Sequence, residues 1–168
     1  AAEEYGRATV VPYPAPDFDP PEWTPPPRPL IGFSGIRKDG QALVEEVCER
    51  NGWDVNPLPA KWSEIDGEMR RLARSSVNVA WYHEGRGISG GVAILIGAQR
   101  PVVTNDSPMF NHLKDAADIY RCGEGGLEAG IRAALEDGTH PTQTYQWLKW
   151  STQVWKVVKV WEDLCGLR

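Results

Sequence analysis

Two glycine-containing segments carry the residues that are best suited to bind an anion. The first runs from Gly32 to Gly40 and contains Gly35, Arg37 and Lys38. Glycine lets a ligand approach the backbone closely, and two adjacent cations beside free N–H groups at a helix start suit a phosphate or diphosphate. A solvated surface turn is the alternative. This segment does not have the GxGxxG spacing, and the chain lacks the GxxxxGK[ST] signature of P-loop proteins.

The second segment runs from His83 to Gly91 and has four glycines among its last seven residues. This is a costly use of flexible backbone, since a glycine loses about 1 kcal/mol relative to alanine in an ordered helix, and it indicates close approach by a ligand. The residues that we expect to contact an anion there are Arg86, Ser89, Gly90 and Gly91. His83 and Glu84 form the adjacent acid/base pair of the chain and are candidate catalytic residues, with ordinary surface positions as the alternative.

Metal and disulfide chemistry are not indicated. The three histidines, His83, His112 and His140, are too scattered for a metal site. The three cysteines, Cys48, Cys122 and Cys165, are odd in number and include no CxxC pair, which argues against a disulfide framework or a zinc knuckle. We therefore expect no metal and a protein of the reducing cytoplasm.

Length and charge limit the classes of protein that remain. The 168 residues suffice for one domain with a core. A net charge of −5 provides no global basic field, so we do not expect nucleic acid as a partner. The longest uncharged apolar run, Val92 to Ile96, is far shorter than the roughly 20 residues that span a bilayer. We expect no membrane span.

The elements that must position the two segments alternate between strand and helix. Apolar runs predict strands within 30–36, 53–58, 77–82, 102–104 and 118–121, and apolar periodicity predicts helices within 41–50, 65–73, 92–98, 107–114 and 127–137. About five alternations predict an α/β fold, in which a Rossmann-like parallel sheet is covered by helices on both faces. Ligands bind at the carboxyl ends of the strands in such sheets, where both glycine segments begin.

The first 29 residues are predicted to be a separate strap or linker. Nine of the 14 prolines lie there, and proline removes a backbone donor and favours extended geometry. A short strand at 8–11 is the one regular element expected in this part. We therefore divide the chain into a proline-rich linker from a preceding domain, residues 1–29, and a Rossmann-like domain, residues 30–168.

One set of residues resembles a known family. Glu84-Gly85-x-Gly, an apolar helix, and then Gln99-Arg100-Pro101-Val102-Val103-Thr104-Asn105-Asp106 resemble the EGFGL and GKPVVATD region of group 1 glycosyltransferases with the GT-B fold. The segment 34–40 is similar to their diphosphate-binding loop, 10–14 to their interdomain linker, and 146–164 to their closing tryptophan-bearing helix. The resemblance covers nearly the whole chain, but only the half that binds the nucleotide-sugar donor.

The chain departs from this family at two positions. The family uses two glutamates separated by seven residues, for the donor sugar and for the ribose, and an ungapped count from Pro101 places Arg86 and Ile94 at these positions. Glu84 could take the role of the first glutamate, toward the donor sugar, only if two residues are inserted in the glycine segment. The chain is also one strand–helix unit shorter, and residues 57–61 are the expected substitute for the base-binding loop.

The resemblance implies transfer of a sugar from a nucleoside diphosphate sugar, commonly with retention and without a metal or other cofactor. The implied diphosphate ligands are Arg37 and Lys38, with backbone groups at Gly35 and 89–91. The acceptor would be bound by an N-terminal half of the same enzyme or by a separate domain. A non-catalytic binding module that lost the glutamates is the alternative function, and a generic flavodoxin-like nucleotide-binding domain is a third.

The C-terminal segment carries a regular aromatic stripe. Trp147, Trp150, Val154, Val157, Trp161 and Leu164 recur at helical spacing, with Leu148 and Trp155 off the stripe. One long helix packed on its own sheet is the simpler expectation. A missing partner domain would account for the second aromatic face.

Overall fold

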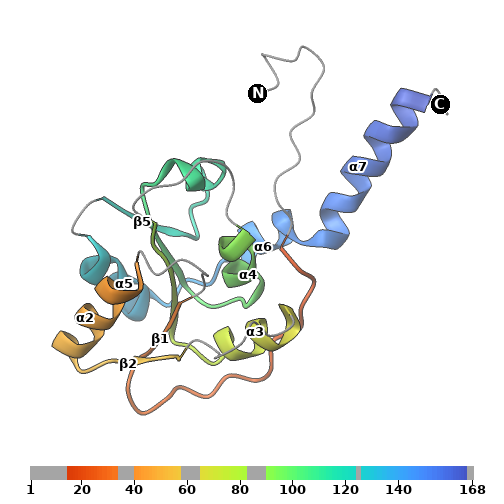
Figure 1. The fold of residues 1–168 in the computed structure, drawn as a ribbon. Coiled ribbons are helices and arrows are strands. Elements are labelled where there is room, and N and C mark those ends of the chain that lie inside the picture. The colour runs from red at the N-terminus through yellow and green to blue at the C-terminus, as the bar shows by residue number, and fades with distance from the viewer. Residues whose placement is uncertain (1–14, 34–39, 58–64, 83–89, 124–125, 166–168) are drawn as a thin grey trace.

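The computed structural model describes residues 15–33, 40–57, 65–82, 90–123 and 126–165. In chain order the elements are β1 (Leu30–Phe33), α2 (Gln41–Asn51), β2 (Asp54–Val55), α3 (Ile65–Leu72), β3 (Val77–Ala80), α4 (Gly90–Gly97), β4 (Val102–Asn105), the 3-10 helix η1 (Pro108–Leu113), β5 (Tyr120–Cys122), α5 (Leu127–Asp137), α6 (Thr142–Leu148) and α7 (Trp150–Cys165). The expected alternation of strand and helix is confirmed within these residues (Figure 1).

The five strands form one sheet in the order β2-β1-β3-β4-β5. Every neighbouring pair is parallel, with Phe33 opposite Val79 and Ala80 opposite Thr104. The chain moves outward from β1 to β2 and then crosses back to β3, so the direction of winding reverses between β1 and β3. The α/β class and the parallel sheet that the sequence predicts are therefore confirmed.

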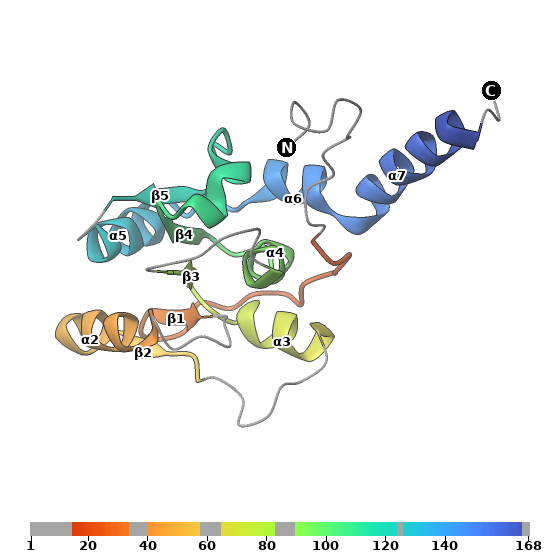
Figure 2. The ribbon, with the colours of Figure 1, turned by 45° about the horizontal axis from the view of Figure 1, so that its top comes forward.

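The side chains of each strand alternate between two hydrophobic layers. Ile31, Val77, Val79 and Val103 join the core cluster that contains buried residues of α2 and α5. Ala80 and Val102 join the opposite cluster, which contains buried residues of α3, α4 and α6 together with Phe110 and Leu113 of η1. Figure 2 shows α2 and α5 on one side of the sheet and α3, α4 and α6 on the other.

Local sequence explains where the helices begin and end. In α2, Val44, Val47 and Cys48 share one buried face, and the helix ends at Gly52, whose φ of 67° lies in the left-handed region that glycine adopts without strain. From Val92 to Ala98 every residue is buried, so α4 is enclosed by packing on all sides. The helix expected at 107–114 is instead the 3-10 helix η1.

Residues 15–29 pack on the domain as a strap. They have no regular secondary structure apart from an isolated bridge at Ala15, but Ala15 and Phe18 are both buried in the core cluster of α4 and α6. The Phe18 backbone N–H donates to the Tyr145 hydroxyl, at 2.9 Å, and its carbonyl accepts from Gln99 Nε2, at 2.8 Å. The strand expected at 8–11 lies outside the described residues.

The long C-terminal helix that the sequence predicts is divided in two. Lys149 is extended, with φ −55° and ψ 143°, and forms a parallel bridge with Ala15, so that α6 ends before it and α7 begins after it. Ala15 donates to the Leu148 carbonyl and accepts from the Trp150 N–H, both at 2.8 Å. The expectation of one continuous stripe was wrong because the strap supplies backbone partners that interrupt the helix.

After this break α7 projects away from the sheet (Figures 1 and 2). Trp150 is 55% exposed and Trp155 is 71% exposed, whereas Leu148 and Gln153 are buried. The simpler expectation, in which the tryptophans cover the sheet, does not hold for these side chains. Among the helices that the structure describes, none has both the length and the apolar character that crossing a membrane requires.

Candidate functional site

The reversal of winding between β1 and β3 marks the candidate site. In open parallel sheets, ligands bind outside the carboxyl ends of the strands at such a switch point. Phe33, at the carboxyl end of β1, is opposite Val79 of β3. The strands that precede residues 34–39 and 83–89 are therefore neighbours and end at the same edge of the sheet.

The end of the first glycine segment contacts the chain shortly before the second segment. Gly40 precedes α2, and a Cβ atom added to it would lie 2.5 Å from the carbonyl oxygen of Trp81, which follows β3. Any larger residue at position 40 would push these two parts of the chain apart. The glycine is therefore required where the end of the first segment meets the residues that precede the second.

Arg71 of α3 fixes the carboxyl ends of two strands. Its guanidinium donates to the Phe33 carbonyl, at 2.8 Å, and to the carbonyls of Asn56 and Pro57, at 3.1 and 3.3 Å. The same group is paired with the buried Glu68 carboxylate at 2.6 Å. This ion pair holds the edge of the sheet next to the first glycine segment.

Asn105 has the corresponding role next to the second segment. It ends β4, and its side-chain amide donates to the Tyr82 carbonyl at 2.7 Å while its side-chain oxygen accepts from the Tyr82 N–H at 3.4 Å. The Tyr82 ring packs on Phe110 of η1 with ring centroids 5.6 Å apart. Tyr82 is thus held on both its backbone and its side chain, directly before residues 83–89.

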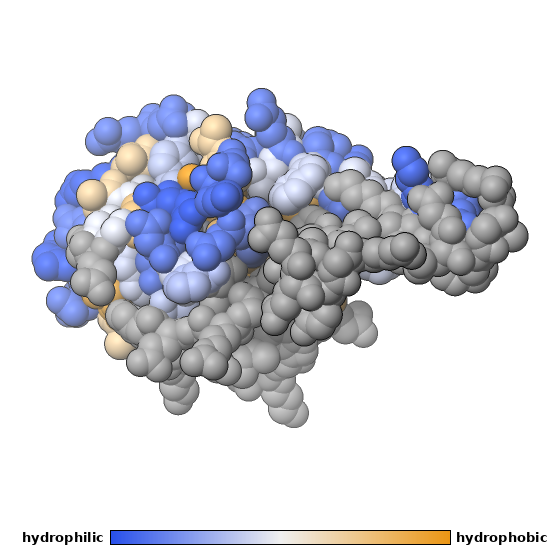
Figure 3. All heavy atoms as spheres, turned by 90° about the horizontal axis from the view of Figure 1, so that it is seen from above, coloured by the Kyte–Doolittle hydropathy of each residue, from blue (hydrophilic) through white to orange (hydrophobic). Residues whose placement is uncertain are grey.

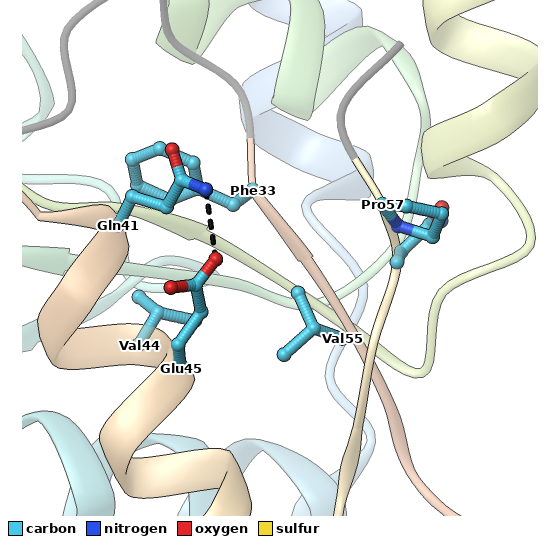
Figure 4. A pocket seen from close by; sticks show the side chains of 7 residues that line it. Phe33, Gln41, Val44, Glu45, Val55 and Pro57 are labelled. Atoms are coloured by element: carbon cyan, nitrogen blue, oxygen red, sulfur yellow. Dashed lines mark hydrogen bonds between the residues drawn. The ribbon is translucent and has the colours of Figure 1, made fainter. Parts of the chain in front are cut away.

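A pocket of about 360 Å³ adjoins the first segment at this edge of the sheet. It lies between the first turns of α2 and the carboxyl end of β2, and Figure 4 shows its labelled side chains. The lining residues are Phe33, Gln41, Val44, Glu45, Val55, Asn56 and Pro57. Its volume falls within the roughly 300–1,000 Å³ of small-molecule sites.

Charges in the described part of this edge are mostly compensated or acidic. Arg71 is paired with Glu68, and Arg121 of β5 is paired with Asp106 at 3.2 Å. Burial, with the nearby carboxylates of Asp54 and Glu45, raises the pKa of the Cys48 thiol to about 11. We therefore expect the cations for an anionic ligand to lie outside the described residues, as Arg37, Lys38 and Arg86 do.

Most of the site residues that the sequence predicts lie outside the described residues. These are Gly35, Arg37, Lys38, His83, Glu84, Arg86 and Ser89. Gly90 and Gly91 are described and form the first two residues of α4, so this helix begins two residues before the start at Val92 that we expected. Of the expected base-binding substitute, Pro57 lines the pocket, and residues 58–61 lie outside the described part.

Ile94 lies at the position where the resemblance places the second glutamate. Its side chain is buried in the core cluster of α4, 8% exposed. It therefore offers neither a polar atom nor access to a ligand. Among the described residues, no group of three or more histidine, cysteine or acidic side chains is placed to hold a metal ion.

The sequence contains two further patterns that indicate this site. The GxGxxG spacing that is missing from the first segment occurs in the second, from Gly85 to Gly90, between β3 and α4. This spacing between a strand and a helix is typical of diphosphate binding. Arg71 and Asn105 were also missed, although the i,i+3 spacing of Glu68 and Arg71 on an amphipathic helix indicates their ion pair.

Comparison of the chain with models of protein families, with curated proteins and with solved structures finds no match.

Proposed function

We propose that this domain binds a nucleoside diphosphate sugar and serves as the donor-binding half of a glycosyltransferase. The observation that carries the proposal is the contact of Gly40 with Trp81 at the switch point of the sheet. Gly40 ends the first glycine segment and Trp81 lies two residues before the second, so this contact supports a common site at the edge where parallel sheets bind ligands. The GxGxxG spacing between β3 and α4 supports the same ligand class.

The proposed chemistry follows from the charge that the leaving diphosphate gains. As the bond between sugar and diphosphate breaks, negative charge grows on the diphosphate oxygens, and groups placed there in advance stabilise the transition state. Arg37 and Lys38 supply cations, and the free N–H groups at the starts of α2 and α4 supply donors. Gly40 provides no side-chain cap for α2, which leaves those N–H groups available. The acceptor and any base that faces it would come from a second domain.

Calorimetric titration with UDP, GDP and their sugar conjugates tests the proposal. We expect binding by the wild-type chain and loss of binding in Arg37→Ala/Lys38→Ala. The matched control is Arg74→Ala/Lys114→Ala, which removes the same charge at two exposed residues outside both glycine segments, and it should bind as the wild type does.

Absence of binding to every nucleotide would contradict the proposal and would favour the second candidate, a non-catalytic module for another ligand. The burial of Ile94 is the observation that favours this candidate, because it removes a family carboxylate from the site. Equal binding by the double variant and its control would instead show that the first segment does not hold the diphosphate.

A further inference from the structure

We propose that the pocket between α2 and β2 binds the nucleoside part of the ligand, and that the Glu45 carboxylate accepts hydrogen bonds from the two ribose hydroxyls. This inference rests on the function proposed above and assigns one part of the ligand to a particular pocket. It concerns described residues, whereas the proposed diphosphate ligands lie mostly outside them.

The pocket lies next to both ends of the first glycine segment. Phe33 is the residue before residues 34–39, Gln41 begins the helix that follows Gly40, and both residues line the pocket. A diphosphate bound by that segment would therefore have its nucleoside within reach of the pocket. The general arrangement of dinucleotide-binding sheets is the same, with phosphate at the first strand–helix turn and ribose beyond the next strand.

The walls of the pocket suit a planar base. Phe33 and Val44 are buried at one side, and the half-buried Val55 and the exposed Pro57 form another (Figure 4). Apolar walls with a few polar groups at fixed positions are the usual composition of small-molecule sites. The pocket is large enough, at about 360 Å³, for a ligand of this kind.

Glu45 is the carboxylate among the lining residues. The carboxyl end of β2 reads Val55-Asn56-Pro57 and carries no acid, and the Asn56 amide is already bonded to the Arg71 carbonyl and Ser75 hydroxyl, at 2.8 and 2.9 Å. One turn earlier on the same helix, Gln41 Nε2 donates to Glu45 Oε1 at 2.7 Å and so orients the carboxylate (Figure 4). An ionised carboxylate is an acceptor only, which matches two adjacent hydroxyl donors.

Asp106 is the alternative candidate for the ribose-binding carboxylate at this edge of the sheet. It follows β4, 21 residues after Gly85, which is close to the spacing of the ribose-binding acid in GxGxxG proteins. Its carboxylate is paired with Arg121 at 3.2 Å, and it does not line the pocket. We therefore assign the ribose to Glu45 and use Asp106 as a competing variant in the test.

Calorimetric titration of the full chain with UDP and GDP, and with their 2′,3′-dideoxy counterparts, tests this assignment. In Glu45→Gln we expect affinity for the ribonucleotide to fall about tenfold, which is the size of effect for hydrogen bonds to a charged group. Affinity for the dideoxynucleotide should not change. Glu49→Gln is the matched control, because Glu49 is an exposed acid one turn later on α2 that does not line the pocket.

The outcomes separate this inference from the proposed function. If no nucleotide binds to the wild-type chain, both are overturned. If nucleotides bind but Glu45→Gln has no effect, weakens both nucleotides equally, or is matched by Glu49→Gln, this inference alone is wrong. A loss of ribonucleotide affinity in Asp106→Asn with none in Glu45→Gln would also overturn it and would move the ribose to β4.

Discussion

Arg71 is the residue on which the geometry of the candidate site depends most. Its guanidinium joins the carbonyls at the ends of β1 and β2 to a carboxylate, Glu68, whose side chain is 4% exposed. Removing one member of a buried pair leaves the other charged and without compensation. We therefore expect Arg71→Met to lower the free energy of unfolding, measured by urea denaturation, by roughly 3 kcal/mol.

The neighbouring Arg70 provides the control for this prediction. It is paired with Asp66 at 3.2 Å on the exposed side of the same helix, and such surface pairs contribute between about 0 and 1 kcal/mol. Arg70→Met should therefore change the free energy of unfolding by less than about 1 kcal/mol. Equal losses in the two variants would show that the Arg71 pair is no more important than a surface pair.

Cys48 makes the stability of the domain sensitive to high pH. Its thiol is buried, and its pKa is raised to about 11 from an ordinary value of 9.0. The folded state therefore favours the protonated thiol. Its contribution to stability is complete below pH 9 and is lost as the pH rises from about 9 to 11.

The measurement is the free energy of unfolding of wild type and Cys48→Ala across that pH range. Burial also raises the pKa values of Tyr120 and Tyr145, which contribute to the slope in both proteins. The free energy of unfolding should fall more steeply with pH in the wild type than in Cys48→Ala, and this difference is the contribution of the Cys48 thiol. Parallel slopes in the two proteins would mean that Cys48 titrates normally in the folded state.

At the level of elements, the division between α6 and α7 determines which C-terminal side chains stabilise the domain. Leu148 is 1% exposed, and Trp155 is 71% exposed. Leu148→Ala should cost roughly 2–5 kcal/mol of unfolding free energy because it leaves a cavity, whereas Trp155→Ala should change it by less than about 0.5 kcal/mol. Chemical denaturation of both variants measures the contrast, and a larger loss in Trp155→Ala would place α7 against the body of the domain.

The elements of the sheet were predictable from sequence, and the C-terminal helices were not. Val77–Ala80 is fully buried and contains two β-branched valines, and α2 has an apolar face that ends at a glycine, so propensity and packing agree there. The break at Lys149 depends on Ala15, which is 134 residues earlier in the chain. A periodicity argument sees only local spacing, so it merges α6 and α7 into one stripe.

The residues that fix the candidate site show the same limit. The glycine segments could be found from composition, and the predicted parallel sheet indicated that the strands before them end at the same edge. The hydrogen bonds of Arg71 to Phe33 and of Asn105 to Tyr82 could not be found in this way, since each joins residues more than 20 positions apart. The pocket around Glu45 depends on the packing of α2 against β2, which local sequence also does not determine.

At the scale of the whole molecule, the strap of residues 15–29 contributes side chains to the core of the domain. Phe18 is 6% exposed and packs in the cluster of α4 and α6, with Arg70 above its ring at 5.7 Å. Phe18→Ala should lower the free energy of unfolding by roughly 3–5 kcal/mol. Asp19→Ala, an exposed change next to it, should shift it by less than about 0.5 kcal/mol.

Thermal unfolding followed by both tryptophan fluorescence and circular dichroism measures this effect. A single transition that shifts together in the two signals would mean that the strap and the sheet unfold as one unit. An unchanged midpoint in Phe18→Ala would show that residues 15–29 behave as a linker. On the face seen in Figure 3, hydrophilic side chains predominate among the described residues.

The bridge at Lys149 also determines where the far end of α7 lies. Asp17 of the strap accepts hydrogen bonds from the N–H and hydroxyl of Ser151, at 3.1 and 3.0 Å, so the strap holds the first turn of the helix at two points. With 16 residues, α7 is about 24 Å long, and a change in its direction would pivot at Lys149, where the helix meets the strap. A tilt of about 10° there would displace its tip by about 4 Å, so a small change at Ala15 or Asp17 would be magnified at the carboxyl end of the helix.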